Sequence, residues 1–142
     1  MRKALVVVSF LLLGAFVLQF AFAAVGAFTE PAGDDSYALH KINGVGVIPG
    51  LTLLSIVFAG LAKAPGRLIG LAALVLGLVA LQALIAVLAD AFTDATGAST
   101  PLGLTVGGLH AVNGIVAVHV AVGVLRGAQR LAPPVAAGAE AP

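Results

Sequence analysis

The sequence contains no cysteine and very few charged residues. Among 142 residues, 7 are Lys or Arg and 6 are Asp or Glu, so 9% are charged, whereas about a quarter is usual in soluble domains. The absence of cysteine excludes disulfide bonds, thiolate metal sites and thiol catalysis. The net charge of +1 excludes a nucleic-acid-binding or polybasic lipid-binding function. The sequence also lacks a Walker loop, a dinucleotide-binding glycine pattern, an H-E-x-x-H motif and a nucleophile elbow.

Hydrophobic residues make up 61% of the chain, and they gather in four long stretches without charge. These stretches are residues 4–29, 42–62, 68–89 and 95–125. Each is as long as the roughly 20 residues that a helix needs to cross about 30 Å of hydrocarbon. We therefore expect an all-α, four-helix transmembrane bundle that occupies residues 1–130. The predicted helices cover about residues 4–28, 38–62, 68–89 and 104–126. Residues 131–142 have no periodicity, and we predict a disordered cytoplasmic tail.

The first hydrophobic stretch has some features of a signal peptide. It follows the basic pair Arg2-Lys3, and Ala21-Phe22-Ala23 resembles a cleavage site. However, the apolar run continues to Phe28, beyond the usual 7–15 residues of a signal peptide. We interpret this stretch as an uncleaved first helix.

The basic residues predict the orientation of the helices. Six of the seven fall on one side of the predicted crossings, namely Arg2, Lys3, Lys63, Arg67, Arg126 and Arg130. Only Lys41 falls on the other side. By the positive-inside rule, we expect a multi-pass protein of a bacterial plasma membrane with both termini in the cytoplasm.

The two halves of the chain resemble one another. Leu18-Gln19 matches Leu81-Gln82, and further along a His-x-x-Asn-Gly element begins at His40 and again at His110. Each half would enter from the cytoplasm and return, so we predict two helix hairpins related as parallel repeats.

Small residues predict how the last two helices pack. Glycines and alanines recur every three or four positions in each, at Gly66, Gly70, Ala73, Gly77 and Ala80 and at Gly114, Ala117 and Ala121. Small residues allow close helix contact in lipid, so we expect these two stripes to face the bundle interior. Pro49-Gly50 should kink the second helix.

The repeated histidines are candidate ligands for a haem iron. In a helix, the Asn and Gly three and four positions after a His lie on the same face as that His. Gly44 and Gly114 would then leave room for a macrocycle, and Asn43 and Asn113 could orient it. Counting residues from the cytoplasmic ends places His40 and His110 about 10 Å apart in height, or about 5 Å if the last helix continues to Arg130. His119 has no matching histidine in the first half.

These motifs carry two resemblances. Over residues 4–126, the Gln…His-x-x-Asn-Gly pattern resembles a family of small four-helix bacterial membrane proteins of unknown function. More remotely, it is similar to one half of haem A synthase, which implies that His40 and His110 are haem ligands. That synthase has a carboxylate where this chain has Tyr37 and an arginine where it has Lys41, and it has cysteines in its outer loops. The resemblance therefore does not imply its oxygenase-like chemistry.

The sequence leaves three functions open. The leading hypothesis is a non-catalytic accessory or stabilising subunit of a larger membrane complex, without cofactor or metal, whose partners are the bilayer and another membrane protein or a second copy. The alternative is a membrane electron-transfer protein that binds haem b through His40, His110, Asn43, Asn113, Gly44 and Gly114. A third hypothesis is a small carrier or quinone-binding protein that uses the glutamine and asparagine residues Gln19, Gln82, Asn43 and Asn113. The first predicts that apolar side chains fill the space between the two histidines, and the second predicts a cavity there.

Overall fold

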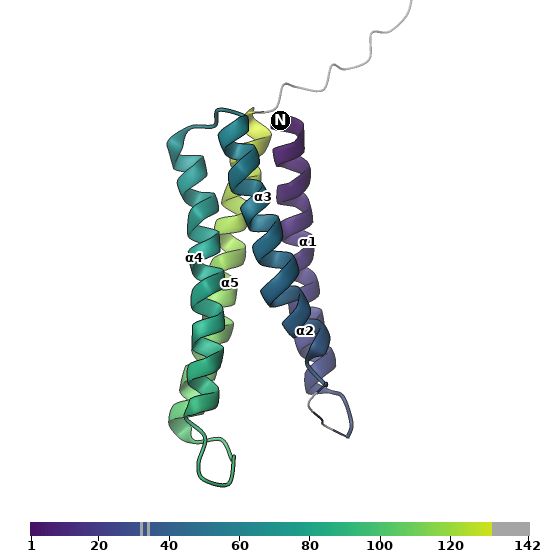
Figure 1. Cartoon of the computed structure of the whole chain (residues 1–142), viewed down its shortest axis with the longest axis vertical. Helices are drawn as coiled ribbons and strands as arrows, with labels where there is room; N and C mark the ends of the chain where they lie inside the picture. The colour runs from purple at the N-terminus through teal and green to yellow at the C-terminus, as the bar shows by residue number, and fades with distance from the viewer. Residues whose placement is uncertain (32, 34, 132–142) are drawn as a thin grey trace, which may run out of the picture.

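The computed structural model describes residues 1–31, 33 and 35–131, and this part of the chain is all-helical (Figure 1). Its elements are α1 (Arg2–Ala27), α2 (Ala38–Ile42), the π-helix η1 (Asn43–Val47), α3 (Ile48–Leu61), α4 (Gly66–Ala91) and α5 (Pro101–Leu131). Because α2, η1 and α3 are continuous, they form one long segment, Ala38–Leu61. The described residues thus contain four helical segments that are each long and apolar enough to cross a membrane. The predicted all-α fold with four crossings is confirmed.

The last helix is longer than the sequence predicts. It begins at Pro101 and continues to Leu131, beyond the predicted range of residues 104–126. Charged residues limit the part of a helix that crosses lipid, but they do not end the helix, which extends past Arg126 and Arg130. Of the predicted tail, Leu131 is the last helical residue, and residues 132–142 lie outside the described part of the chain.

The helices form two hairpins that diverge toward one end (Figure 1). One hairpin contains α1 and the α2–η1–α3 segment, and the other contains α4 and α5. A tight turn links the hairpins at the end where the chain begins, and in it Lys63 has a positive φ of 53°. At the opposite end the hairpins separate, and the described loop residues 28–31, 33, 35–37 and 92–100 lie there (Figure 1).

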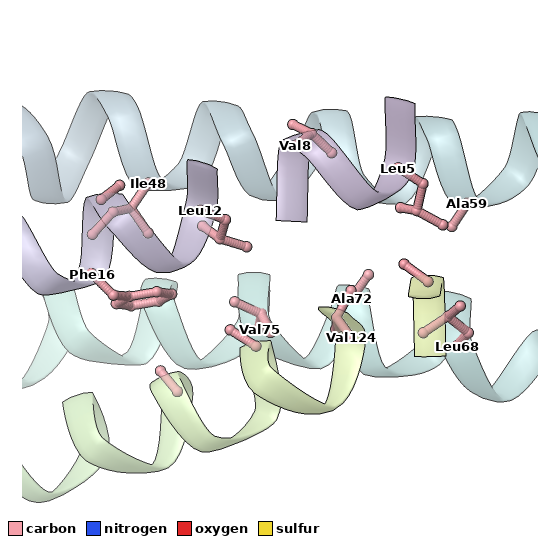
Figure 2. Packing of buried hydrophobic residues seen from close by; sticks show 14 of the residues in the cluster. Leu5, Val8, Leu12, Phe16, Ile48, Ala59, Leu68, Ala72, Val75 and Val124 are labelled. Atoms are coloured by element: carbon pink, nitrogen blue, oxygen red, sulfur yellow. The ribbon is translucent and has the colours of Figure 1, made fainter. Parts of the chain in front are cut away.

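The hydrophobic core lies in the half of the bundle near the chain's first residue, and Figure 2 shows how its side chains pack. Leu5 and Leu12 of α1, Val75 of α4 and Val124 of α5 are at most 1% exposed. No force expels apolar side chains from lipid, so these contacts stabilise the bundle through close packing. The core ends near Phe16 of α1, about halfway along the helix.

The small residues of α4 do not pack as the sequence suggests. Gly66, Gly70 and Gly77 have open space where a Cβ would stand, and this face of α4 is exposed. Leu68, Ala72 and Val75 are buried instead. The prediction for α4 is wrong because every face of this helix is apolar, so composition does not distinguish a lipid-facing from a buried face. On α5, Ala117 and Ala121 are buried as expected.

The second segment leaves α-helical geometry just before Pro49. Residues Asn43–Val47 form the π-helix η1, and α3 begins at Ile48. Proline lacks an N–H group and its ring collides with the preceding turn, so a wider turn accommodates it. The wide turn begins three residues after His40 and contains Asn43 and Gly44, two of the candidate site residues.

Candidate functional site

A cavity of about 260 Å³ opens where the hydrophobic core ends. One wall comes from α1 and the α2–η1–α3 segment, and the other comes from α4 and α5. The lining is largely apolar, with phenylalanine, leucine, valine, isoleucine and alanine side chains. Its polar members among the described residues are Gln19, His40, Lys41, Gln82 and His110.

The two candidate histidines both line this cavity and lie close to each other. The centroids of the His40 and His110 rings are 6.2 Å apart, and the ring planes are inclined by 44°. Rings this close cannot differ in height by the roughly 10 Å that residue counting gave for a helix ending at Arg126. The extension of α5 to Leu131 accounts for much of the difference.

In the first hairpin, Gln19 of α1 holds His40 of α2. His40 Nδ1 lies 3.1 Å from the main-chain oxygen of Gln19. The side-chain nitrogen of Gln19 is 3.1 Å from His40 Nε2 and 3.1 Å from the main-chain oxygen of His40. These contacts fix the imidazole at the cavity wall from both of its nitrogens.

In the second hairpin, Gln82 of α4 holds His110 of α5 by a similar but smaller set of bonds. His110 Nδ1 lies 3.1 Å from the main-chain oxygen of Gln82. The side-chain nitrogen of Gln82 donates to the main-chain oxygen of His110 at 2.6 Å. Among the described residues, no hydrogen bond to His110 Nε2 is formed, and the half-buried ring lines the cavity.

These bonds determine which nitrogen of each histidine carries the proton. A carbonyl oxygen only accepts hydrogen bonds, so Nδ1 of His40 and of His110 must donate. In the neutral ring, Nε2 is then the unprotonated nitrogen with a free lone pair. For His40, this agrees with the amide of Gln19, which donates to Nε2. Each histidine thus has the tautomer that a metal ligand binding through Nε2 requires.

The two asparagines lie behind the cavity wall. Asn43 donates to the main-chain oxygen of Ala15 at 2.9 Å and to Gln19 Oε1 at 2.8 Å. Asn113 makes the equivalent bonds to the main-chain oxygen of Leu78 and to Gln82 Oε1. Both asparagines are buried, at 4% and 7% exposure. They orient the glutamines, whereas the sequence hypothesis had assigned them to the cofactor itself.

Gly44 and Gly114, the two glycines of the repeated motif, line the cavity. The space that a side chain would occupy at each of them is next to a glutamine side chain. A Cβ at Gly44 would stand 2.7 Å from the side-chain nitrogen of Gln19. A Cβ at Gly114 would stand 3.5 Å from that of Gln82. Gly44 is therefore required by the Gln19–His40 contact, and Gly114 has more space around it.

The haem hypothesis drawn from the sequence did not include the glutamines, which only the carrier or quinone-binding hypothesis used. Gln19 and Gln82 have corresponding places in the two copies of the predicted repeat, eight and nine residues before the ends of α1 and α4, and this recurrence was the available signal. Lys41 also lines the cavity, and Tyr37 packs edge-on against His40 with ring centroids 6.2 Å apart. His119 is exposed on α5 and does not belong to the cavity lining.

Comparison with known proteins identifies a family but no activity. No curated protein and no solved structure matches the chain. A family described as a family of unknown function, DUF6220, matches residues 19–90. This range contains Gln19, His40 and Gln82 and covers half of the chain. The protein therefore belongs to the DUF6220 family of unknown function.

Proposed function

We propose that this protein binds haem b in the membrane, with His40 and His110 as the two axial ligands. The observation that carries the proposal is the 6.2 Å separation of the two ring centroids. A metal binds an imidazole nitrogen at about 2.0–2.1 Å, and a ring atom lies about 1.1 Å from the ring centre, so two imidazoles on one metal have centroids about 6.3 Å apart. The observed separation leaves the distance that one metal needs between the two rings, once Nε2 of each ring is turned toward it.

The hydrogen bonds of the site support the same proposal. Metal-binding histidines usually donate their second ring N–H to a carbonyl or a carboxylate, which fixes the ring and its tautomer. His40 and His110 both have such a bond, to the main-chain oxygens of Gln19 and Gln82. Both rings thus have the tautomer that binds iron through Nε2, and at His40 the iron would replace the amide of Gln19 on that nitrogen.

The choice of a haem, rather than a bare metal ion, follows from the number of ligands. Among the described residues, no group of three or more His, Cys, Asp or Glu side chains could hold a metal ion. A protein-bound zinc ion usually takes four ligands, or three and a water. In a haem, the macrocycle supplies the remaining ligands, and two histidines are sufficient.

A bound haem would supply one-electron redox chemistry at the wide end of the bundle. The contribution of this chain is to bind and orient it. His40 and His110 would fix the iron, and the apolar lining around Phe16 and Phe20 would exclude water from its surroundings.

An absorption spectrum tests the proposal directly. The purified protein, supplied with haem b in detergent, should give the low-spin spectrum of a bis-histidine haem. His40→Ala and His110→Ala should each abolish that spectrum, whereas His119→Ala should retain it because His119 is exposed outside the cavity. Retention of the low-spin spectrum in both cavity variants would refute the proposal.

A second candidate function is an accessory subunit of a membrane complex, and the exposed face of α4 favours it. Gly66, Gly70 and Gly77 leave open space on this face, and small residues allow another helix to approach closely. Gly77→Leu should then weaken association in native mass spectra of membrane extracts, while Gly14→Leu, on an open face of α1, should leave it unchanged. Equal association in the two variants would argue against this candidate.

We further propose the plasma membrane of a bacterium as the location, with both termini in the cytoplasm. The support is the distribution of Lys and Arg, because only Lys41 lies on the other side of the crossings. The cavity would then open toward the outer face of the membrane.

A further inference from the structure

We propose that the ligand of the cavity is a planar ring system that carries carboxylate groups, and that Lys41 binds these carboxylates at the wide end of the bundle. This inference rests on the proposed function and deepens it. It names the class of ligand, a porphyrin dicarboxylate rather than a neutral flat molecule such as a quinone, and it gives the orientation of the ligand in the site.

The first argument is the position of Lys41 in the cavity wall. Lys41 is the only charged residue among the described residues that line the cavity. It directly follows His40 in α2 and is exposed. A lysine ammonium on a flexible stem can therefore reach a group that projects from the cavity while its stem stays against the apolar wall.

The second argument is the distribution of charge along the molecule. The six other basic residues lie near the opposite end of the helices, at Arg2, Lys3, Lys63, Arg67, Arg126 and Arg130. The described residues of the wide end carry carboxylates, at Glu30, Asp35, Asp90 and Asp94. A carboxylate ligand placed at this end without Lys41 would meet only like charge. A neutral ligand would need no cation here, and a single lysine at the cavity therefore favours an anionic one.

The two arguments together fix an orientation. The ring system lies between the hairpins, against the apolar lining where the core ends, and its carboxylates point toward the loops. The opposite orientation would bury the carboxylates at the core end of the cavity, against the apolar side chains of Phe16 and Ile48 and away from Lys41, the one cation among the described lining residues.

The test compares two porphyrins that differ only in charge. Metal-free protoporphyrin IX and its uncharged dimethyl ester are titrated into the purified full-length protein in detergent, with porphyrin fluorescence as the readout. Neither probe requires axial ligands, so binding depends on the cavity and on charge. The variants are Lys41→Met, Lys41→Arg and Lys41→Glu, and the matched control is Lys3→Met, because Lys3 is exposed at the opposite end.

The wild-type protein should bind the diacid about 10- to 100-fold more tightly than the ester, the range expected for a hydrogen bond to a charged group. Lys41→Met should abolish this preference, Lys41→Arg should retain it, and Lys41→Glu should reverse it. Lys3→Met should behave as the wild type. Binding of the ester should stay unchanged in every variant, which shows that each variant is folded.

The inference and the proposed function fail in different ways. Equal binding of the two porphyrins by the wild-type protein, or a preference that persists in Lys41→Met, would overturn the inference while the haem spectrum could still depend on both histidines. A preference for the diacid that depends on Lys41, together with a haem spectrum that is unchanged in His40→Ala and His110→Ala, would overturn the proposed function alone. Failure of the wild-type protein to bind either porphyrin would overturn the inference, whereas the proposed function would still be decided by the haem spectrum of the histidine variants.

Discussion

The side-chain nitrogen of Gln19 lies 3.1 Å from Nε2 of His40, whereas no described residue forms a hydrogen bond with Nε2 of His110. The two hairpins therefore present their histidines differently, although the remaining bonds are alike. A ligand can approach Nε2 of His110 directly. At His40, it must first replace the amide of Gln19.

This asymmetry predicts different effects for the two glutamines. Gln19→Ala removes a competing donor from His40, whereas Gln82→Ala removes equivalent bonds to the main chain and to Asn113 without changing access to His110 Nε2. Haem affinity should therefore be about 3- to 10-fold higher in Gln19→Ala than in Gln82→Ala, as expected for one hydrogen bond. Spectroscopic titration with haem b measures both constants. Equal affinities would show that Gln19 does not compete with a ligand.

Gly44→Ala should destabilise the bundle, and Gly46→Ala provides a matched control in the same π-helix. A Cβ at Gly44 would stand 2.7 Å from Gln19, whereas a Cβ at Gly46 meets nothing within 4 Å. Overpacking of this kind commonly costs about 1–3 kcal/mol. Thermal unfolding in detergent should thus shift downward for Gly44→Ala alone. Equal transitions in the two variants would mean that the Gln19 amide moves aside without cost.

The two faces of α4 should respond oppositely to a leucine. Ala72 is 1% exposed in the core, so Ala72→Leu should lower the free energy of unfolding by about 1–3 kcal/mol. Gly77 faces open space, and Gly77→Leu should leave the stability of the monomer unchanged or raise it, since leucine favours the helix by up to about 1 kcal/mol. Unfolding of the two variants in detergent checks this. Destabilisation by Gly77→Leu would indicate that this face of α4 is packed in the bundle interior, as the sequence suggested.

The loop before α5 should depend on pH through Asp94. The hydroxyl of Thr96 and the main-chain N–H groups of Ala98 and Thr96 donate to its carboxylate, and these bonds hold the pKa of Asp94 below its ordinary value of 3.8. The stabilisation is fully present above pH 3.8 and is lost as the pH falls through the lower pKa of the folded loop. NMR signals of the Thr96 and Ala98 amides should titrate below pH 3.8, and Thr96→Ala should raise that midpoint. A midpoint that stays the same in Thr96→Ala would contradict the assignment.

The proposed orientation predicts the labelling of single cysteines in intact cells. Ser99 lies in an exposed loop at the wide end, and Gly66 is exposed at the tight turn between α3 and α4. Ser99→Cys should react with a membrane-impermeant maleimide from outside, and Gly66→Cys should react only after lysis. Because native cysteines are absent, the background is low. The reverse labelling pattern would show that the protein has the opposite orientation and that its cavity opens toward the cytoplasm.

The sequence by itself determined the class of fold. Four charge-free stretches are sufficient to predict four helices that can cross a membrane, because lipid demands long apolar helices. The repeated His-x-x-Asn-Gly element likewise identified His40 and His110 as a pair, since these polar groups are costly in lipid. The sequence could not predict which face of α4 is buried, because all of its faces are apolar.

Only the tertiary structure decided how the site is built. The count of residues placed His40 and His110 at different heights, and the extension of α5 past Arg126 with the wide turn at Asn43–Val47 brought their rings to 6.2 Å. Gln19 and Gln82 hold the two histidines through hydrogen bonds between helices. Residue spacing within a single helix does not reveal such bonds. The core closes the bundle at one end and leaves it open at the other. That opening depends on how the two hairpins pack against each other, and such contacts between distant segments are not encoded in any local pattern of the chain.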